Sequence, residues 1–236
     1  MKKLVIIPAY NESANIVSAV SDIRENAPGF DYIVVNDCST DDTLRVCRAQ
    51  GIRVLKVPVN LGIGGAVQTG YLYGLRQGYD AAVQFDGDGQ HDARYLESMA
   101  QAMDEQQADM VIGSRFITKE GFQSTRMRRM GIGFFTGLIR MVTGKTITDP
   151  TSGMRLVNLD VMRMFAADYP KDYPEPESLV RIIAAGKKVV EIPVRMKERA
   201  GGVSSISLLK SIYYMIKVTL AVLLAKTSRY RGEELL

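Results

Sequence analysis

Short apolar segments alternate with amphipathic segments over the first half of the chain. Runs rich in β-branched residues occupy positions 4–7, 32–35, 54–57, 81–85 and 110–112. Between them, apolar residues recur at helical spacing over positions 13–25, 43–50, 66–77 and 93–105. Strands that alternate with single helices are typical of βαβ units, in which helices cover both faces of a parallel sheet. The pattern therefore predicts an α/β fold with a mostly parallel sheet.

The pattern changes after Arg115. A basic stretch at 123–143 has helical character, and 148–154 has the character of a loop that enters a strand through Val157. Three prolines between 169 and 176 predict irregular structure there, because proline lacks an N–H and fixes its own φ. A further helix is expected at 177–185 and a further strand at 188–194.

The segment 206–226 is apolar apart from Lys210, Lys217, the Lys226 that ends it and a few hydroxyl groups. Its longest uncharged run, 218–225, is far shorter than the roughly 20 residues that span a bilayer. On a helical wheel one side carries Ser207, Lys210, Tyr214 and Lys217. This arrangement predicts an amphipathic helix on a membrane surface, with packing on the protein core or on a partner as the alternatives.

These features divide the chain into a globular domain of residues 1–205 and a helical tail of residues 206–236. The formal net charge is +4, but it is unevenly distributed. Positions 115–145 carry a net charge of +6 and positions 195–231 a net charge of +7, which leaves −9 for the rest. Two separate basic stretches point to an anionic partner, such as nucleic acid, phospholipid or a phosphorylated substrate.

Several classes of protein are disfavoured by the composition. The only cysteines are Cys38 and Cys47, which indicates neither a disulfide framework nor a cysteine-only zinc site. The first apolar run ends at Pro8 and is too short for the core of a signal peptide, so a cytoplasmic protein is expected. The single histidine, without a motif that marks a nucleophile, disfavours Ser-His or Cys-His catalysis.

Polar, turn-forming segments follow each of the first four predicted strands, at positions 8–12, 36–42, 60–65 and 86–92. In open parallel sheets, ligands bind beyond the carboxyl ends of the strands. A polar turn after one strand is ordinary turn chemistry, but four with this many carboxylates predict one shared site.

The fourth of these segments contains Asp86-Gly87-Asp88. In an extended chain, residues two apart point the same way, so two carboxylates would face one spot. Such hard oxygen ligands suit Mg²⁺, Mn²⁺ or Ca²⁺. A calcium-binding EF-hand is excluded, because its sixth position needs glycine and His91 stands there. The alternative for the three residues alone is a simple tight turn.

Seven short segments of the chain resemble the motifs of a known enzyme family. Segments 6–12, 34–41, 60–62 and 86–91 resemble family 2 glycosyltransferases, which have the GT-A fold. Segments 112–115, 149–155 and 199–205 resemble the dolichyl- and polyprenyl-phosphate sugar synthases within that family. The similarity extends in order over roughly residues 3–206.

The resemblance implies roles for individual residues. The donor-binding set would be Pro8, Ala9, Tyr10, Glu12, Asp37, Asp86, Gly87, Arg199, Ser204 and Ser205, with Asp37 near the base. The metal, Mg²⁺ or Mn²⁺, would be held by Asp86, Asp88 and Gln90. Arg115, with Arg128 or Arg129, would meet an acceptor phosphate. Arginine suits these positions because its planar fork can bind two phosphate oxygens.

The chain departs from the synthases in two places. Ser205 stands where they usually carry a lysine, which removes one charge from the donor site. The sequence at 173–177, Tyr-Pro-Glu-Pro-Glu, is also unlike theirs. A sugar-hydroxyl acceptor needs a general base, and Glu175 or Glu177 would serve, whereas a phosphate acceptor needs none. The alternative is a helix start, with Pro176 in the first turn and Glu177 favoured by the helix dipole.

The function expected is therefore inverting, metal-dependent transfer of a sugar from a nucleotide-diphosphate sugar. The acceptor would be membrane-borne, either a polyprenyl phosphate or a lipid-linked glycan, reached from the cytoplasmic face by a peripheral enzyme. The alternatives are an inactive nucleotide-sugar-binding scaffold for a small membrane-protein partner, and a nucleotidyltransferase. Nucleic-acid binding is disfavoured because the basic stretches lack interleaved aromatic residues.

Overall fold

The computed structural model describes residues 1–118, 126–197 and 208–225. Seven strands form one sheet in the order β3-β2-β1-β4-β6-β5-β7. The strands are β1 (Lys3–Ala9), β2 (Phe30–Asn36), β3 (Val54–Lys56), β4 (Ala81–Gln84), β5 (Met110–Ser114), β6 (Arg155–Asn158) and β7 (Val189–Pro193). All neighbours are parallel except β6, which runs antiparallel to β4 and β5. The predicted α/β fold with a mostly parallel sheet is confirmed.

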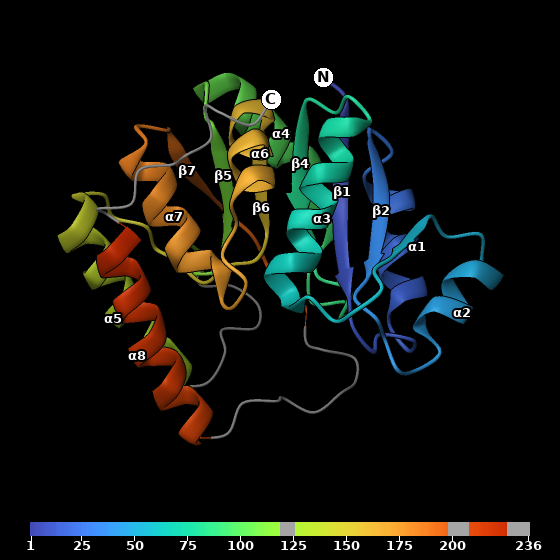
Figure 1. The fold of residues 1–236 in the computed structure, drawn as a ribbon. Coiled ribbons are helices and arrows are strands. Elements are labelled where there is room, and N and C mark those ends of the chain that lie inside the picture. Colours follow the sequence, from blue (N-terminus) through green and yellow to red (C-terminus); the bar gives the residue numbers. More distant parts are fainter. Residues whose placement is uncertain (119–125, 198–207, 226–236) are drawn as a thin grey trace.

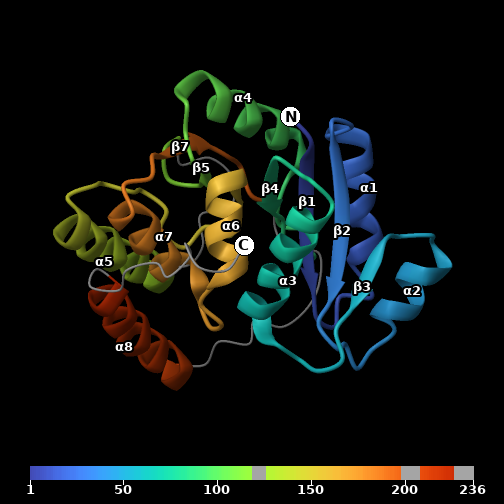
Figure 2. The same ribbon diagram turned by 45° about the horizontal axis from the view of Figure 1, so that its top comes forward.

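Helices cover both faces of this sheet (Figures 1 and 2). One apolar cluster packs on α1 (Ile16–Asn26), α2 (Thr43–Ala49) and α4 (Leu96–Gln106), which follows a short 3₁₀ helix (Ala93–Tyr95). The other cluster contains residues of α3 (Gly62–Arg76), α5 (Arg126–Thr143), α6 (Leu159–Ala167), α7 (Pro174–Ala184) and α8 (Leu208–Ala225). Strands β1, β4 and β5 have residues in both clusters, so the sheet is buried on both faces as its continuous apolar runs require.

The amino-terminal end of α3 lies against the loop before α7. The N–H of Gly64 donates to the Lys171 carbonyl over 3.1 Å. A Cβ at Gly64 would come within 2.0 Å of the Pro170 carbonyl oxygen, so this approach requires glycine. The contact joins the first half of the chain to the segment that leads into α7.

Helix α7 begins at Pro174, earlier than the sequence predicts, and Pro176 lies in its first turn. Tyr173 precedes it with a φ of 52°, in the left-handed region that a bulky residue rarely adopts. The Tyr173 ring packs edge-on against Tyr214 of α8, with 4.6 Å between the ring centroids. The start of α7 is thus fixed partly by the carboxyl-terminal helix.

Helix α8 forms where the sequence predicts a helix, and one of its sides packs on the core through Val218, Val222 and Ala225. Lys217 lies near this packed side, because its Nζ pairs with Asp172 at 2.5 Å. The solvent-facing side is apolar and consists of Tyr213, Ile216, Leu220, Leu223 and Leu224. No described helix is long and apolar enough to cross a bilayer.

Candidate active site

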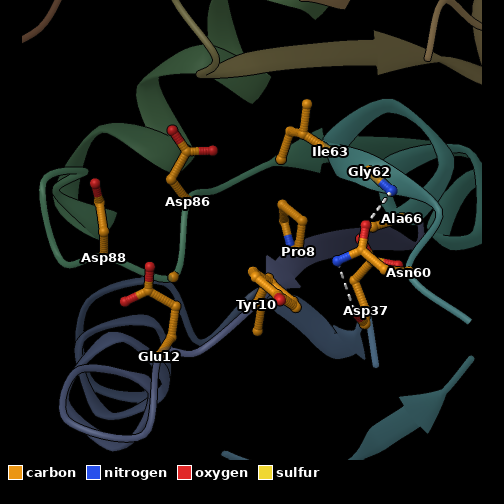
Figure 3. A pocket seen from close by; sticks show the side chains of 12 residues that line it. Pro8, Tyr10, Glu12, Asp37, Asn60, Gly62, Ile63, Ala66, Asp86 and Asp88 are labelled. Atoms are coloured by element: carbon orange, nitrogen blue, oxygen red, sulfur yellow. Dashed lines mark hydrogen bonds between the residues drawn. The ribbon is translucent and has the colours of Figure 1, made fainter. Parts of the chain in front are cut away.

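A pocket of ≈ 430 Å³ opens at the carboxyl ends of β1, β2 and β4 (Figure 3). Its lining consists of Pro8, Ala9, Tyr10, Glu12, Asp37, Asn60, Gly62, Ile63, Ala66, Asp86, Gly87 and Asp88. The structure therefore brings together eight of the residues that the sequence predicts for donor and metal binding. The other four follow the third strand, within or next to a segment that the polar-turn pattern already marks.

Asp37 is fixed at one side of the pocket by the chain that follows β3. It is 3 % exposed, and its Oδ1 accepts the Leu61 N–H over 2.7 Å. Asn60 donates from Nδ2 to the Asp37 carbonyl oxygen over 3.3 Å. Tyr10 lies between this side and the acidic side (Figure 3), and the residue is 48 % exposed. A planar aromatic ring beside a fixed carboxylate is suited to a nucleobase, which presents both a face and hydrogen-bond donors.

The loop after β1 is held against the loop after β2 by polar side chains. The Asn11 Oδ1 accepts the Thr40 N–H over 2.8 Å, and Asn11 has a φ of 59°, a conformation that asparagine tolerates. The Glu12 N–H donates to the Thr43 Oγ1 over 2.9 Å. These bonds give the pocket wall a defined geometry although it is built from loops.

Asp86, Asp88 and Glu12 lie on the opposite side of the pocket from Asp37 (Figure 3). The Asp88 Oδ1 accepts the N–H of Gln90, over 3.0 Å, which closes a tight turn. The Asp86 N–H donates to Nδ1 of the buried His91 over 2.9 Å. Gln90, a predicted third ligand, lies in the same turn. The structure thus contains the tight turn, and Asp86 and Asp88 line the same side of the pocket.

These residues fit a divalent cation that is shared with a substrate. No group of three or more His, Cys, Asp or Glu side chains that could hold a metal occurs within the described part of the chain. Mg²⁺ is commonly held by one or two carboxylates together with substrate phosphates and water. Asp86 and Asp88 supply such an incomplete set, so the donor's own oxygens would complete it.

The Asp86 carboxylate is confined by the segment that enters β6. Its Oδ1 accepts from Gln84 Nε2 over 3.2 Å. A Cβ built on Gly153 would lie 3.1 Å from Asp86 Oδ2 and 3.0 Å from Gln84 Nε2, which is closer than ordinary contact. The Gly153 backbone therefore closes one wall around Asp86.

Arg115, predicted to meet an acceptor phosphate, is engaged by a buried carboxylate. Its Nε and Nη2 donate to the two oxygens of Asp149 over 2.6 and 2.7 Å, and Nη2 also donates to Thr151 over 3.0 Å. Arg115 is 15 % exposed at its side chain and Asp149 is fully buried. Arg128 and Arg129 are the other residues predicted to meet the acceptor phosphate, and both belong to α5. Arg129 is exposed, and the side chain of Arg128 is not among those that the structure describes.

Glu175 and Glu177, the two alternatives for a general base, have different surroundings in the structure. Glu177 pairs with Arg181 one turn along α7, at 2.5 Å. Burial raises the pKa of the Glu175 carboxyl; Arg155 and Gln84 act to lower it, and the Asp86 carboxylate raises it further. Glu175 thus lies within range of the Asp86 and Arg155 charges, although it does not line the pocket, whereas Glu177 pairs with a residue of its own helix.

Arg199, Ser204 and Ser205 lie outside the described residues. Lys197, two positions before Arg199, donates its N–H to the Gln90 carbonyl over 2.9 Å. The chain that leads to the predicted diphosphate-binding arginine therefore passes directly beside the Asp88 turn.

Comparisons with known proteins agree with this geometry. The model of the family "Glycosyl transferase family 2" matches residues 4–165. The chain is 32 % identical over 216 residues to an undecaprenyl-phosphate mannosyltransferase of Micrococcus luteus, covering 88 % of each chain. It is 31 % identical over 241 residues to a polyprenol monophosphomannose synthase of Mycolicibacterium smegmatis, covering 98 % of this chain and 91 % of the relative.

Among solved structures, the fold is similar to that of a glucosyl-3-phosphoglycerate synthase of Mycobacterium tuberculosis bound to Mn²⁺, UDP and phosphoglyceric acid. The TM-score is 0.73 at 19 % identity, over 97 % of this chain and 79 % of that one. At this identity the likeness concerns the fold alone, and it supports the GT-A architecture that the sequence predicts.

Proposed function

Because the chain belongs to glycosyl transferase family 2, we propose that it moves a sugar from a nucleotide-diphosphate donor to the phosphate of a polyprenyl phosphate. The observation that carries the donor half is the pocket in which Asp86 and Asp88 lie on the side opposite Asp37, with Tyr10 between the two sides. The acceptor half is supported by two relatives whose names contain polyprenyl phosphates or polyprenols, each matched over most of its length.

The pocket orients the donor by its two unlike sides. Asp37 and Tyr10 bind the nucleoside, and the Asp86–Asp88 side receives the diphosphate. A divalent cation bound there would stabilise the charge that develops on the departing diphosphate. Arg199, Ser204 and Ser205 add donors to the same oxygens.

Transfer proceeds with inversion in one displacement. An acceptor oxygen attacks the anomeric carbon of the sugar while the bond from that carbon to the diphosphate oxygen breaks, and the nucleoside diphosphate leaves. A phosphate acceptor is ionised near neutral pH, since its second pKa is about 6, and so it needs no general base. Arg128 or Arg129 then holds the acceptor phosphate together with Arg115, which Asp149 orients.

A sugar hydroxyl of a lipid-linked glycan is the second candidate acceptor, and the position of Glu175 favours it. A hydroxyl must lose its proton as it attacks, and a carboxylate near the metal-binding side can take that proton. Glu175→Gln separates the two acceptors. With a hydroxyl acceptor we expect kcat to fall by about 10²–10⁴-fold, the usual contribution of a general base. With a phosphate acceptor the loss stays far smaller.

We further propose that the protein works at the surface of a membrane, on its cytoplasmic face. The neighbouring helix α5 also exposes large apolar side chains, namely Met130, Phe134 and Met141. Neither helix contains an acidic residue, while both contain lysine or arginine. Apolar side chains flanked by cations suit an anionic lipid surface.

The membrane proposal is tested with point variants, because deleting α8 would remove core residues as well. We expect wild-type protein to sediment with anionic vesicles, Leu220→Ser combined with Leu224→Ser to weaken this at least 10-fold, and Leu72→Ser on α3 to leave it unchanged. Absence of sedimentation by wild-type protein would contradict the lipid surface and favour a small membrane-protein partner.

The donor site is tested by thermal stabilisation with UDP, GDP, dTDP and CMP, each with Mn²⁺ and again with EDTA. We expect one nucleotide to stabilise the protein and EDTA to abolish the effect. Turnover is then measured with the matching nucleotide sugars and polyprenyl phosphate. Metal-dependent binding without turnover on any acceptor would favour the scaffold alternative, and pyrophosphate release from a nucleoside triphosphate would favour a nucleotidyltransferase.

A further inference from the structure

One buried arginine connects the two segments that border Asp86. Arg155, at the start of the central strand β6, is 1 % exposed and is among the largest fully buried side chains. Lysine and arginine are almost never fully buried unless their charge and donors are engaged. The neighbours that engage Arg155 therefore indicate what it does.

The donors of Arg155 reach main-chain oxygens from two different parts of the chain. Nε donates to the Ser152 carbonyl over 2.8 Å, and Nη2 donates to the Pro150 carbonyl over 2.8 Å. Nη1 donates to the Glu175 carbonyl over 2.6 Å and to the Ser178 hydroxyl over 3.2 Å. Four bonds to the loop before β6 and to the first turn of α7 thus come from one guanidinium group.

The bonds from Arg155 to the loop before β6 hold that loop next to Asp86. Gly153 follows directly on the Ser152 carbonyl that Arg155 holds, and its backbone confines the Asp86 carboxylate. The Ser152 hydroxyl also donates to the Gly113 carbonyl over 2.6 Å, which fixes the same loop to β5. A shift of this loop would move the wall against which Asp86 rests.

The bonds from Arg155 to α7 fix the backbone position of Glu175. Arg155 holds the main-chain oxygen of this residue, and its positive charge acts on the Glu175 carboxyl, which the Asp86 charge also reaches. The carboxylates of Glu175 and Asp86 belong to elements far apart in the sequence. Arg155 is the described side chain that bonds to both supporting segments.

We propose that Arg155 is a positioning residue whose planar fork sets the separation between Asp86 and Glu175, and thereby the place of the transferred sugar between them. This inference rests on the proposed function for its consequence, but the geometric link is independent of it. Arginine is required because its donors lie in one rigid plane and reach several acceptors at once, whereas lysine offers one point charge.

The test uses Arg155→Lys, which keeps the charge and loses the fork, and the milder Ser178→Ala, which removes only one of the acceptors. Arg181→Met is the matched control. It removes a mostly buried arginine of α7 that pairs with Asp168 and with Glu177 of the same helix.

Hydrogen exchange is measured first, because it requires no turnover. For Arg155→Lys we expect at least 10-fold faster exchange both at 151–153 and in the α7 turn at 178–180, which follows the two prolines at the start of that helix. For Ser178→Ala we expect a smaller increase in the α7 turn, and for Arg181→Met no change at 151–153. Unchanged exchange at 151–153 in Arg155→Lys would overturn the proposal, whether or not the enzyme proves active on any acceptor.

Activity supplies a readout that a purely structural role would not move. We expect Arg155→Lys to lower kcat at least 10-fold with little change in the KM for the donor. On an acceptor for which Glu175→Gln itself lowers kcat at least 10-fold, the double variant falls no more than about 3-fold below the less active single variant, because the two residues act together. Fully additive losses, or wild-type kcat in Arg155→Lys, would refute the role. Absence of turnover in wild-type protein would instead refute the proposed function and leave the exchange result to decide.

Discussion

Substitution of Gly153 offers a direct test of how firmly the structure holds Asp86. The Cβ of an alanine there would stand 3.1 and 3.4 Å from the two Asp86 oxygens and 3.0 Å from Gln84 Nε2, so these neighbours must give by a few tenths of an ångström. A misplacement of about 1 Å at a reacting centre can cost about 10²-fold in rate. A displacement of a few tenths of an ångström then corresponds to a loss of rate of roughly 3- to 10-fold.

We therefore expect Gly153→Ala to weaken Mn²⁺-dependent nucleotide binding and kcat by about 3- to 10-fold, and Gly153→Val to weaken them by more than about 10²-fold. Overpacking of this kind costs about 1–3 kcal/mol of stability, so both proteins should remain folded. Binding is measured by calorimetry over a series of Mn²⁺ concentrations, and stability by urea denaturation.

Gly137→Ala is the control, because a Cβ at Gly137 on α5 meets no atom within 4 Å. It should bind metal and nucleotide as the wild type does, and gain up to about 1 kcal/mol from helix propensity. If Gly153→Ala and Gly153→Val both fold and both keep the wild-type Mn²⁺ dependence, the Asp86 carboxylate is not held by this wall and the reasoning fails.

Three further predictions concern other parts of the molecule. Asp88→Asn should lower kcat by more than about 10²-fold, with a Tm equal to or above that of the wild type because a like charge is removed; retained metal-dependent turnover would contradict the metal assignment. Asp149→Ala should lower the free energy of unfolding by about 3–5 kcal/mol in urea, since it leaves the Arg115 charge mostly buried without its carboxylate; a loss below about 1 kcal/mol would show that the pair contributes little. Burial, and then Asp31, raise the pKa of Tyr79 to about 12 from an ordinary value of 10.0. The folded pKa lies above the unfolded one, so this stabilisation is present below pH 10 and is lost as the pH rises toward 12. Tyr79→Phe should flatten that part of the stability profile in urea titrations, and an unchanged profile would contradict the shift.

Much of the donor side was predictable from the sequence, because it depends on one local rule applied several times. Each strand of the first half is followed by a polar turn, and parallel strands bring such turns to one edge of the sheet. The pairing of strands supplies the long-range geometry, so no residue has to be placed individually. Asp37 and Asp86, nearly 50 positions apart, consequently line one pocket.

The acceptor side was less predictable, because its partners are set by tertiary contacts. The antiparallel insertion of β6 between β4 and β5 has no local signal. The bond between Arg115 and Asp149 joins residues 34 positions apart, and composition treats both as surface charges. Composition also predicts that Arg155 is exposed, because arginine is mostly found at the surface, but in the structure it is buried.

The carboxyl-terminal helix shows the limit of a helical wheel. The wheel sorts its residues into two sides, but it does not say which side meets the protein. Lys217 and Tyr214 define a polar side, yet Lys217 pairs with Asp172 and Tyr214 packs on Tyr173 and Phe135. Apolar residues therefore lie on two sides of α8: Val218, Val222 and Ala225 pack on the core, and a second apolar side faces outward, a division that the wheel alone does not give.

This orientation connects the proposed membrane surface to the chemistry. Tyr214 of α8 touches Tyr173, which stands two residues before Glu175 at the start of α7. The Glu175 and Arg155 charges in turn act on the pKa of the Tyr214 hydroxyl, which burial raises. The helix with the exposed apolar side is thus in contact with the segment that borders Asp86. A lipid-borne acceptor has to present its reactive oxygen to the donor while its chain stays in the bilayer. If α8 meets lipid as proposed, a fold in which this helix also supports the start of α7 meets that requirement without a membrane-spanning segment in the described part of the chain.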